Sequence, residues 1–352
     1  MIFRQLFDAA SSTYTYLLAC AETREAMIID TVFEQYDRDA ALVRELDLKV
    51  RYVLDTHVHA DHVTGAWLWR EQTGAQSGIA DAANVDETDI RIANGDVFAF
   101  GNESITARTT PGHTSGCLTY VTRDLSMAFT GDTLLIRGAG RTDFQGGSAH
   151  RMWQSIREQI FTLPDHCLLY PGHDYDGRTV STVAEEKAYN PRIGGEAKEE
   201  DFVGYMNNLA LPHPRLIDIA VPANLKGGKP DQPLVNESWG PIIQTFAGVP
   251  EIRPDWVARH RDELHLLDVR SEGEYSGELG HICGAQLIPL DELRNRLSEV
   301  PQEKPVIAIC QSGRRSAMAT QILRQGGIDH CANLAGGMIQ WQRLSLPSTA
   351  LD

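Results

Sequence analysis

The sequence of 352 residues predicts an α/β protein built from two domains. Strand-like apolar runs alternate with helical patterns twice, first before residue 210 and again after residue 250. A proline-rich stretch separates the two series. Because 42% of the residues are hydrophobic, a chain of this length can bury two cores. We therefore expect a first domain over residues 1–245, including the proline-rich stretch, and a second over 251–352.

The first series consists of short β-rich runs joined by helical segments. In the segment 150–163, Met152, Ile156 and Ile160 recur every four residues, as on one face of a helix. The strand-like runs are AMIID (26–30), RYVLDTH (51–57), ITARTT (105–110), LTYVT (118–122), MAFTGD (127–132) and CLLYPGH (167–173).

The stretch from about 210 to 255 holds eight prolines and predicts irregular chain that ends in a linker. A compact second series follows it. Its predicted elements are a strand at 264–270, a strand at 305–310, a helix at 314–327 and a strand at 331–337.

Charge and cysteine usage restrict the setting. The formal net charge of -16 argues against a nucleic-acid or anionic-membrane partner, since both would repel an acidic surface. The first twenty residues lack a charged leader before a long apolar stretch, so we expect no cleaved signal and no membrane span. The six cysteines are widely spread without a CxxC pair, which predicts a reducing, cytoplasmic location. Composition leaves homo-oligomerisation open.

Histidines crowd into the stretch THVHADH, which begins at residue 56. It places His57, His59, Asp61 and His62 within six positions, although the whole chain has only 12 histidines. Imidazole and carboxylate are ligands for zinc, iron or manganese. The alternative is a set of solvated loop histidines with an aspartate that caps a helix.

The positions of the predicted strand ends favour a metal site over solvated loop histidines. The predicted strands end on His57, His113, Asp132 and His173. Loops beyond strand ends converge on one crevice in α/β sheets, so these groups can meet although they lie far apart in sequence. A cluster of this size outweighs the alternative.

These residues carry a family resemblance. HxHxDH followed by PGHTSG, FTGD and YPGHDY resembles the metallo-β-lactamase fold, an αββα sandwich with its metal site at one sheet edge. Most such proteins are hydrolases with two metals, and the whole ligand set is present here. The ligands alone therefore point to a binuclear hydrolase such as glyoxalase II. The seven positions are His57, His59, Asp61, His62, His113, Asp132 and His173.

Other stretches resemble the persulfide dioxygenases, which share the sandwich but keep one non-haem iron. The resemblance covers nearly all of residues 1 to 230, including 129–156, 160–192 and AVPANLK at 220–226. It implies one Fe(II) per chain on His57, His113 and Asp132. The remaining four positions would surround these ligands without binding the metal, or be vestigial. They are His59, Asp61, His62 and His173.

Three protein ligands leave three iron positions open, which suits a substrate sulfur together with O2. The implied substrate is glutathione persulfide, whose terminal sulfur leaves as sulfite. Its two carboxylates need cations and hydrogen-bond donors, because the protein is acidic. By resemblance the candidates are Arg141, Tyr175 and Lys226. Arg178 and Asn224 are weaker candidates. Alternatively, Arg141 forms an internal ion pair with Asp143 or Asp174.

The second series has its own candidate in ICQSGRRSAMATQIL, where Cys310 ends an apolar strand just before a helix. The amides and the dipole at a helix start favour a thiolate, and Arg314 and Arg315 add positive charge. The alternative is a buried structural cysteine.

The flanking sequence decides between these readings of Cys310. The stretches 266–285 and 333–341 resemble a single rhodanese domain over about 251–352, an α/β fold with a parallel sheet. Rhodaneses carry sulfur as a cysteine persulfide. Related phosphatases have an arginine six positions after the cysteine, where this chain has Ser316. The framework positions would be Asp268, Arg270, Glu274, His281 and Gly284.

Both resemblances concern the same persulfide. The sequence therefore predicts a glutathione persulfide dioxygenase fused to a thiosulfate:glutathione sulfurtransferase, with thiosulfate and glutathione as further small-molecule substrates. One alternative is a binuclear zinc hydroxyacylglutathione hydrolase fused to a rhodanese. Another is that the second domain is a non-catalytic docking or sensing module.

Overall fold

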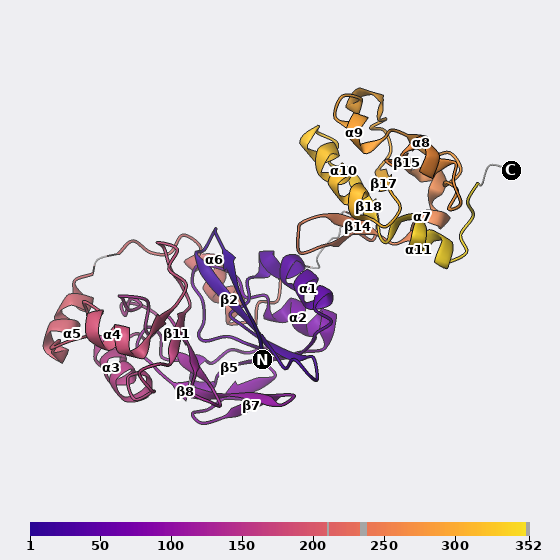
Figure 1. Cartoon of the computed structure of the whole chain (residues 1–352). Helices are drawn as coiled ribbons and strands as arrows, with labels where there is room; N and C mark the ends of the chain where they lie inside the picture. Colours follow the sequence, from indigo (N-terminus) through magenta and orange to yellow (C-terminus); the bar gives the residue numbers. More distant parts are fainter. Residues whose placement is uncertain (210, 233–237, 350–352) are drawn as a thin grey trace. The chain divides into compact units, whose positions relative to one another are not determined.

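The computed structural model describes residues 1–209, 211–232 and 238–349. These residues divide into two compact units, one drawn mainly from the chain before residue 233 and the other mainly from the chain after it (Figure 1). The predicted limits of 245 and 251 stay a prediction. Strand β13 (Ile243–Gln244) pairs with β14 (Pro250–Ile252) in the sheet of the second unit. No helix among the described residues is long and apolar enough to cross a bilayer.

The first unit is a sandwich of two sheets. In the first sheet the strands follow chain order, with antiparallel pairing up to the third strand and parallel pairing beyond it. Its strands are β1 (Ile2–Asp8), β2 (Thr13–Ala19), β3 (Glu25–Ile29), β4 (Lys49–Leu54), β5 (Gln76–Ala80) and β6 (Ile90–Ile92).

The second sheet also follows chain order, and only the pair β10 and β11 within it is parallel. Its strands are β7 (Val97–Phe100), β8 (Glu103–Thr109), β9 (Leu118–Thr122), β10 (Met127–Gly131), β11 (Leu168–Pro171) and β12 (Ser181–Thr182). All six strand-like runs singled out in the sequence of this unit are therefore strands.

An aromatic core fills the space between the two sheets. Tyr16 of β2 contacts Phe129 of β10 with ring centroids 4.9 Å apart, and Phe129 stacks on Tyr170 of β11. All three side chains are buried. Burial of such large apolar surfaces is the main driving force that holds the two sheets together.

Helices cover the outer faces, as the predicted αββα sandwich requires. The helices α3 (Ala149–Ser155), α4 (Val183–Tyr189) and α5 (Glu199–Asn207) lie together on one side of the strands in Figure 1. Their side chains share a buried cluster with the second sheet. On the other side are α1 (Tyr36–Glu45) and α2 (Ala66–Thr73), and α2 contacts β4 and β5.

Two elements differ from the sequence prediction. The predicted helix at 150–163 turns into a π-helix over Ile156–Ile160. The chain predicted as irregular contains helix α6 (Ile217–Asn224), despite Pro222 inside it. Val221 and the following Leu225 pack against a buried cluster, so tertiary contacts outweigh the loss of one backbone donor.

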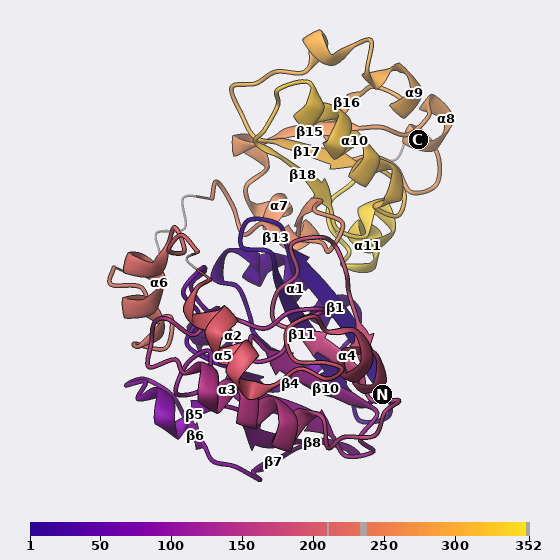
Figure 2. The ribbon, with the colours of Figure 1, turned by 90° about the vertical axis from the view of Figure 1, so that its left-hand side faces the viewer.

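The second unit is a smaller α/β domain around a largely parallel sheet, as predicted. Strands β15, β17 and β18 lie side by side with α10 (Arg314–Gln325) against them (Figure 2). Only the edge pair of β13 and β14 is antiparallel. The sheet order is β13, β14, β18 (Cys331–Leu334), β17 (Val306–Ile309), β15 (His265–Asp268) and β16 (Gln286–Leu287).

Candidate metal centre and cysteine loop

Three of the predicted metal ligands follow the ends of strands and lie close together. His57 follows β4 and His113 follows β8, while Asp132 comes directly after β10. The ligand atoms of these three residues all lie within 4.8 Å of one another, and His57 and His113 are buried. The expectation that distant strand ends converge thus holds for these residues.

Hydrogen bonds leave one nitrogen of each histidine for a cation. Nδ1 of His113 donates to the carbonyl oxygen of Arg141 at 2.7 Å, so Nε2 keeps its lone pair. His57 Nδ1 lies 2.9 Å from the Thr56 hydroxyl, which itself donates to Asp30 at 2.8 Å. The Thr56 oxygen therefore accepts from Nδ1, and Nε2 of His57 is left as the ligand atom.

Charge states also fit metal binding. Burial lowers the pKa of both His57 and His113, which keeps the imidazoles neutral. Burial opposes the charge of Asp132, but His173 and the other nearby histidines hold its pKa well below the usual range. Two neutral imidazoles and one carboxylate form a two-histidine, one-carboxylate set that suits a divalent metal such as ferrous iron.

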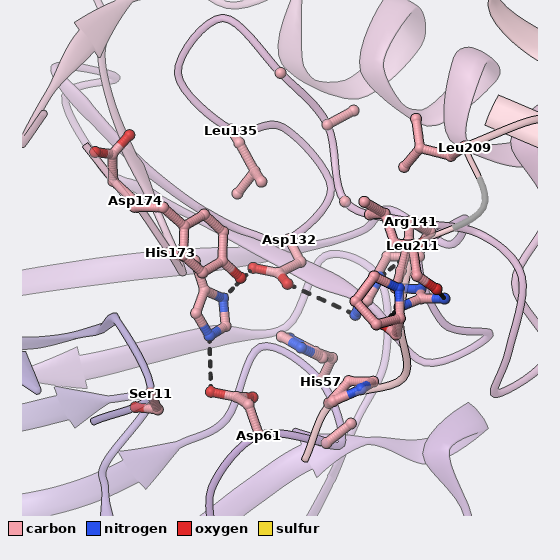
Figure 3. A pocket seen from close by; sticks show the side chains of 18 of the residues that line it. Ser11, His57, Asp61, Asp132, Leu135, Arg141, His173, Asp174, Leu209 and Leu211 are labelled. Atoms are coloured by element: carbon pink, nitrogen blue, oxygen red, sulfur yellow. Dashed lines mark hydrogen bonds and ion pairs between the residues drawn. The ribbon is translucent and has the colours of Figure 1, made fainter. Parts of the chain in front are cut away.

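His173 is committed to two carboxylates. Figure 3 shows its ring between Asp132 and Asp61, with contacts of 2.7 Å from Nδ1 and 2.9 Å from Nε2. Burial disfavours a charge on this ring, yet the two carboxylates hold its pKa well above the ordinary value. Both ring nitrogens of His173 thus contact carboxylates in this structure, whereas His57 and His113 each keep one nitrogen without a hydrogen bond among the described residues.

Two neighbouring histidines have unpaired ring nitrogens in the described part of the chain. Nδ1 of His59 and Nε2 of His62 are buried without a hydrogen-bond partner among the described residues. With Asp61 they form a second group whose ligand atoms lie within 4.8 Å. Such orphaned atoms are expected where a cation or water completes the site. The donor set thus fits one metal on His57, His113 and Asp132, and retains atoms for a second.

Two glycines let the backbone close around Asp132. A Cβ at Gly140 would lie 2.2 Å from the carbonyl oxygen of Asp132 and 3.1 Å from Nδ1 of His113. A Cβ at Gly172 would lie 2.7 Å from the Asp132 carboxylate. Any side chain at either position would displace the ligand residue.

A cavity of about 790 Å³ opens onto the three ligands. The segment 211–216 with Leu209 lines it together with residues 135–141, and Leu135, Arg141, Leu209 and Leu211 are labelled in Figure 3. Cationic side chains are frequent on its lining, although the chain as a whole is acidic. They are Arg137, Arg141, Arg178, Arg192 and Arg215.

Of the residues expected to contact glutathione, three line the cavity. Arg141 donates to both oxygens of Asp143 at 2.7 Å and to the carbonyls of Leu211 and Pro212. The alternative of an internal ion pair with Asp143 thus describes its state here. Arg178 pairs with Asp174 and Asp176, while Tyr175 is largely exposed beside His173.

The other two lie off the cavity lining. Lys226 is half exposed and pairs with Asp231 at 2.9 Å. Asn224 is buried at the end of α6, where its amide bonds the backbone of His59, His62 and Thr64. Asn224 therefore holds the histidine-rich loop rather than facing the cavity. A glutathione contact by either residue stays a prediction that this geometry does not support.

Sequence reasoning missed Arg192, His213 and Arg215 on the lining. Arg192 donates to the carbonyl of Ala139, but Arg215 is exposed and has no partner among the described residues. Its only sequence signal is a cation in an otherwise uncharged, proline-rich segment, LPHPRL.

In the second unit, Cys310 follows β17 directly and is buried. Its sulfur accepts from the backbone N–H of Gly313 at 3.2 Å, at the start of α10. The predicted cationic field is only partly present. Arg315 is paired with both oxygens of Glu274, whereas Arg314 is exposed and free of partners among the described residues.

Of the remaining framework positions, Glu274 contacts this loop through Arg315. Arg270 and Asp268 form a fully buried ion pair of 2.6 Å, and Arg270 also donates to the carbonyls of Glu274 and Gly280. His281 stacks on Tyr275. Gly284 takes the left-handed conformation with φ 84°.

Comparison with known proteins agrees with both halves of this arrangement. Residues 9–173 match the metallo-beta-lactamase superfamily, and residues 253–344 match the rhodanese-like domain. The persulfide dioxygenase ETHE1 of Mus musculus is 52% identical over 229 residues, which are 65% of this chain and 89% of the mouse protein. The chain belongs to the ETHE1 persulfide dioxygenase family.

Structural relatives agree. The crystal structure of ETHE1 from Myxococcus xanthus has a TM-score of 0.63 and 49% identity, covering 65% of this chain and all of that one. A metallo-beta-lactamase from Staphylococcus aureus, 24% identical with a TM-score of 0.60, covers 95% of this chain and 98% of its own length. That relative supports the fold alone. The ETHE1 likeness covers 65% of this chain.

Proposed function

We propose that the first unit oxidises glutathione persulfide to glutathione and sulfite with one Fe(II), and that the second unit is a thiosulfate:glutathione sulfurtransferase. The observation that supports the first part is the ligand arrangement: His57, His113 and Asp132 bring their ligand atoms within 4.8 Å of one another on the cavity lining. His173 also lines the cavity, but both of its ring nitrogens contact carboxylates, those of Asp61 and Asp132. The likeness to ETHE1 supports the substrate class.

The three ligand residues would hold the iron, which would supply the activation of dioxygen. The protein's own groups prepare that site. The Arg141 carbonyl and the Thr56 hydroxyl fix which histidine nitrogen faces the cavity. His173 contacts one oxygen of Asp132, and the other oxygen lies 3.7 Å from Nε2 of His113. Glutathione persulfide, dioxygen and water together give glutathione and sulfite.

The cavity wall would bind the peptide part of the substrate. Glutathione carries two carboxylates, and the lining offers Arg215 as a cation without a partner among the described residues, together with the hydroxyl of Tyr175. Arg141 would join them if a substrate carboxylate replaced the carbonyls of Leu211 and Pro212. A charge-assisted hydrogen bond to arginine contributes about 1.5–3 kcal/mol, so these contacts can position the sulfur at the ligands.

In the second unit, Cys310 would take a sulfur atom from thiosulfate and pass it to glutathione. The free cation at Arg314 and the amide of Gly313 favour an anionic sulfur donor and a thiolate. The persulfide formed this way is the substrate of the first unit. All six cysteines are free, which supports a reducing cytoplasmic setting.

One observation favours the hydrolase alternative. The unpaired nitrogens of His59 and His62 would suit a second metal, as in a binuclear zinc hydroxyacylglutathione hydrolase. A hydroxyacylglutathione hydrolase of Cereibacter sphaeroides is 38% identical over 193 residues. The higher identity to ETHE1 favours the dioxygenase.

Anaerobic metal analysis followed by oxygen uptake with glutathione persulfide tests the proposal. We expect about one iron per chain and one O2 consumed per sulfite formed. His57→Ala should abolish oxygen uptake, because the ligand set then loses a third of its donors. Two tightly bound zinc ions with rapid thioester hydrolysis and no oxygen uptake would refute the proposal.

A further inference from the structure

A chain of buried polar groups leads away from the Cys310 sulfur. The Ser316 hydroxyl lies 3.2 Å from Sγ of Cys310 and 2.5 Å from Oδ1 of Asn333. The Asn333 amide nitrogen then donates to Glu251 at 2.6 Å. Ser316 and Asn333 are at most 1% exposed, so water does not replace these contacts. The pairing of β14 with β18, which sets Glu251 opposite Asn333, fixes the end of the chain.

The direction of each hydrogen bond can be assigned. The Glu251 carboxylate accepts, so the nitrogen of the Asn333 amide must face it and the oxygen must face Ser316. That oxygen can only accept, so the Ser316 hydroxyl gives its single proton to Asn333. The serine oxygen then offers a lone pair to Cys310, which suits a thiol that donates its S–H.

This direction changes when the sulfur becomes anionic. A thiolate cannot donate, and a lone pair of Ser316 facing it would be repulsive. The hydroxyl can instead rotate and donate to the sulfur, at the cost of leaving Oδ1 of Asn333 without a donor. Buried acceptors without partners are costly, so the two contacts of Ser316 compete.

We infer that Ser316 is a catalytic residue of the second unit whose hydroxyl has two positions, one donating to Asn333 and one donating to the anionic sulfur of Cys310. Asn333, oriented by Glu251, is then the positioning residue that competes for this proton. The inference rests on the proposed sulfurtransferase function for its role in turnover, but the two positions concern Cys310 alone.

Both half-reactions pass through the anionic sulfur. In the first, the Cys310 thiolate attacks the outer sulfur of thiosulfate, a new S–S bond forms, and sulfite leaves with the electron pair of the broken bond. In the second, a glutathione thiolate attacks the outer sulfur of the cysteine persulfide, and Cys310 leaves as thiolate. The Ser316 hydroxyl would stabilise Cys310 as nucleophile in one step and as leaving group in the other.

Alkylation of Cys310 by iodoacetamide, followed by peptide mapping of the full-length chain, tests the two positions without any sulfur donor. Ser316→Ala removes the donor, so we expect alkylation at neutral pH to slow by about fivefold or more. Asn333→Leu removes the competing acceptor at similar volume, so we expect alkylation to become about threefold faster or more. Thr320→Val is the matched control. Thr320 is a buried hydroxyl of α10 that donates to the Ser316 carbonyl and has no contact with Cys310.

Opposite shifts in the two variants support the inference, because a merely structural role would move both rates the same way. Equal directions, or an unchanged rate in Ser316→Ala, would overturn it. Transfer from thiosulfate is assayed separately on the same proteins. Opposite alkylation shifts in a chain that transfers no sulfur would refute the sulfurtransferase function and the catalytic role of Ser316, but would leave the two positions of its hydroxyl standing.

Discussion

The backbone carbonyl of Arg141 accepts a 2.7 Å hydrogen bond from Nδ1 of the metal-ligand candidate His113. The guanidinium of the same arginine holds the carbonyls of Leu211 and Pro212, which also line the cavity. One residue thus serves the ligand through its backbone and the cavity wall through its side chain. A change of side chain should separate these two tasks.

Arg141→Ala should leave the iron content unchanged, because the carbonyl that fixes His113 remains. The apparent KM for glutathione persulfide should rise by about tenfold, since the cavity wall loses its tether and the substrate loses a cation. Steady-state oxygen uptake and metal analysis on the same preparation measure both effects. Arg123→Ala, an exposed arginine outside the cavity lining, is the control. Loss of iron in Arg141→Ala would show that the side chain also secures the ligand.

Asn224→Ala should destabilise the loop that carries His59 and His62 and thereby weaken the retention of the metal. The buried amide makes three hydrogen bonds to the backbone of the loop that carries His59 and His62. Removing it leaves buried groups unpaired, so the free energy of unfolding should fall by about 2–4 kcal/mol. Chemical denaturation and iron retention during dialysis report the effect. Asn208→Ala, which removes one exposed contact to Gly204, should change neither.

Arg215→Ala and Lys226→Ala compare a cation on the cavity lining with one outside it. Arg215 lines the cavity without a partner among the described residues, whereas Lys226 pairs with Asp231 away from the lining. We expect Arg215→Ala to raise the apparent KM for glutathione persulfide about tenfold, with less than twofold change in Lys226→Ala. A rise confined to Lys226→Ala would restore the contact predicted from sequence and contradict the role of Arg215.

Cys310→Ser should separate the two reactions. A serine hydroxyl does not ionise near neutral pH, so thiosulfate sulfurtransferase activity should fall by at least about 100-fold. Oxygen uptake with supplied glutathione persulfide should stay within about twofold. Uptake driven by thiosulfate plus glutathione should vanish, because it needs both sites in sequence. If that coupled uptake continued at the parent rate, the second unit would be a docking module.

The ion pair of Arg315 and Glu274 beside the cysteine loop predicts a pH dependence of stability. The Arg315 contact lowers the pKa of Glu274 from 4.5 to about 2. The stabilisation is therefore complete above pH 4.5 and disappears as the pH falls towards 2. Glu274→Gln should lower the urea midpoint of the second unit at pH 7, and the difference from the parent should shrink below pH 4.5. Glu272→Gln, an exposed neighbour on the same helix, is the control. A difference that stays constant between pH 7 and pH 2 would exclude this ion pair as its source.

The sequence was most informative where a residue of a metal-ligating type directly follows a strand-like run. His57, His113 and Asp132 were identifiable because each follows an apolar run that could only be a strand, and strand ends meet. Helix α6 could not be foreseen, because Pro222 within it signals a break while packing of Val221 and Leu225 supplies the stability.

The contacts that individual side chains make could not be predicted from the sequence either. Whether Arg141 faces a substrate or Asp143 depends on distances that no motif encodes, and both readings were open in the sequence. The link from Cys310 to Glu251 depends on the register of β14 against β18, elements about 80 positions apart in the chain. Local sequence patterns carry no information on such a register.

The glycines at positions 140 and 172 have a consequence for protein engineering. Both approach Asp132 too closely for any Cβ, and Gly140 also approaches His113. Random libraries at these two positions would yield inactive clones almost without exception, since every replacement moves a metal ligand. Retuning this centre towards another metal or reaction must therefore start at other cavity positions, such as Ser11 and Leu135, whose side chains line the same space.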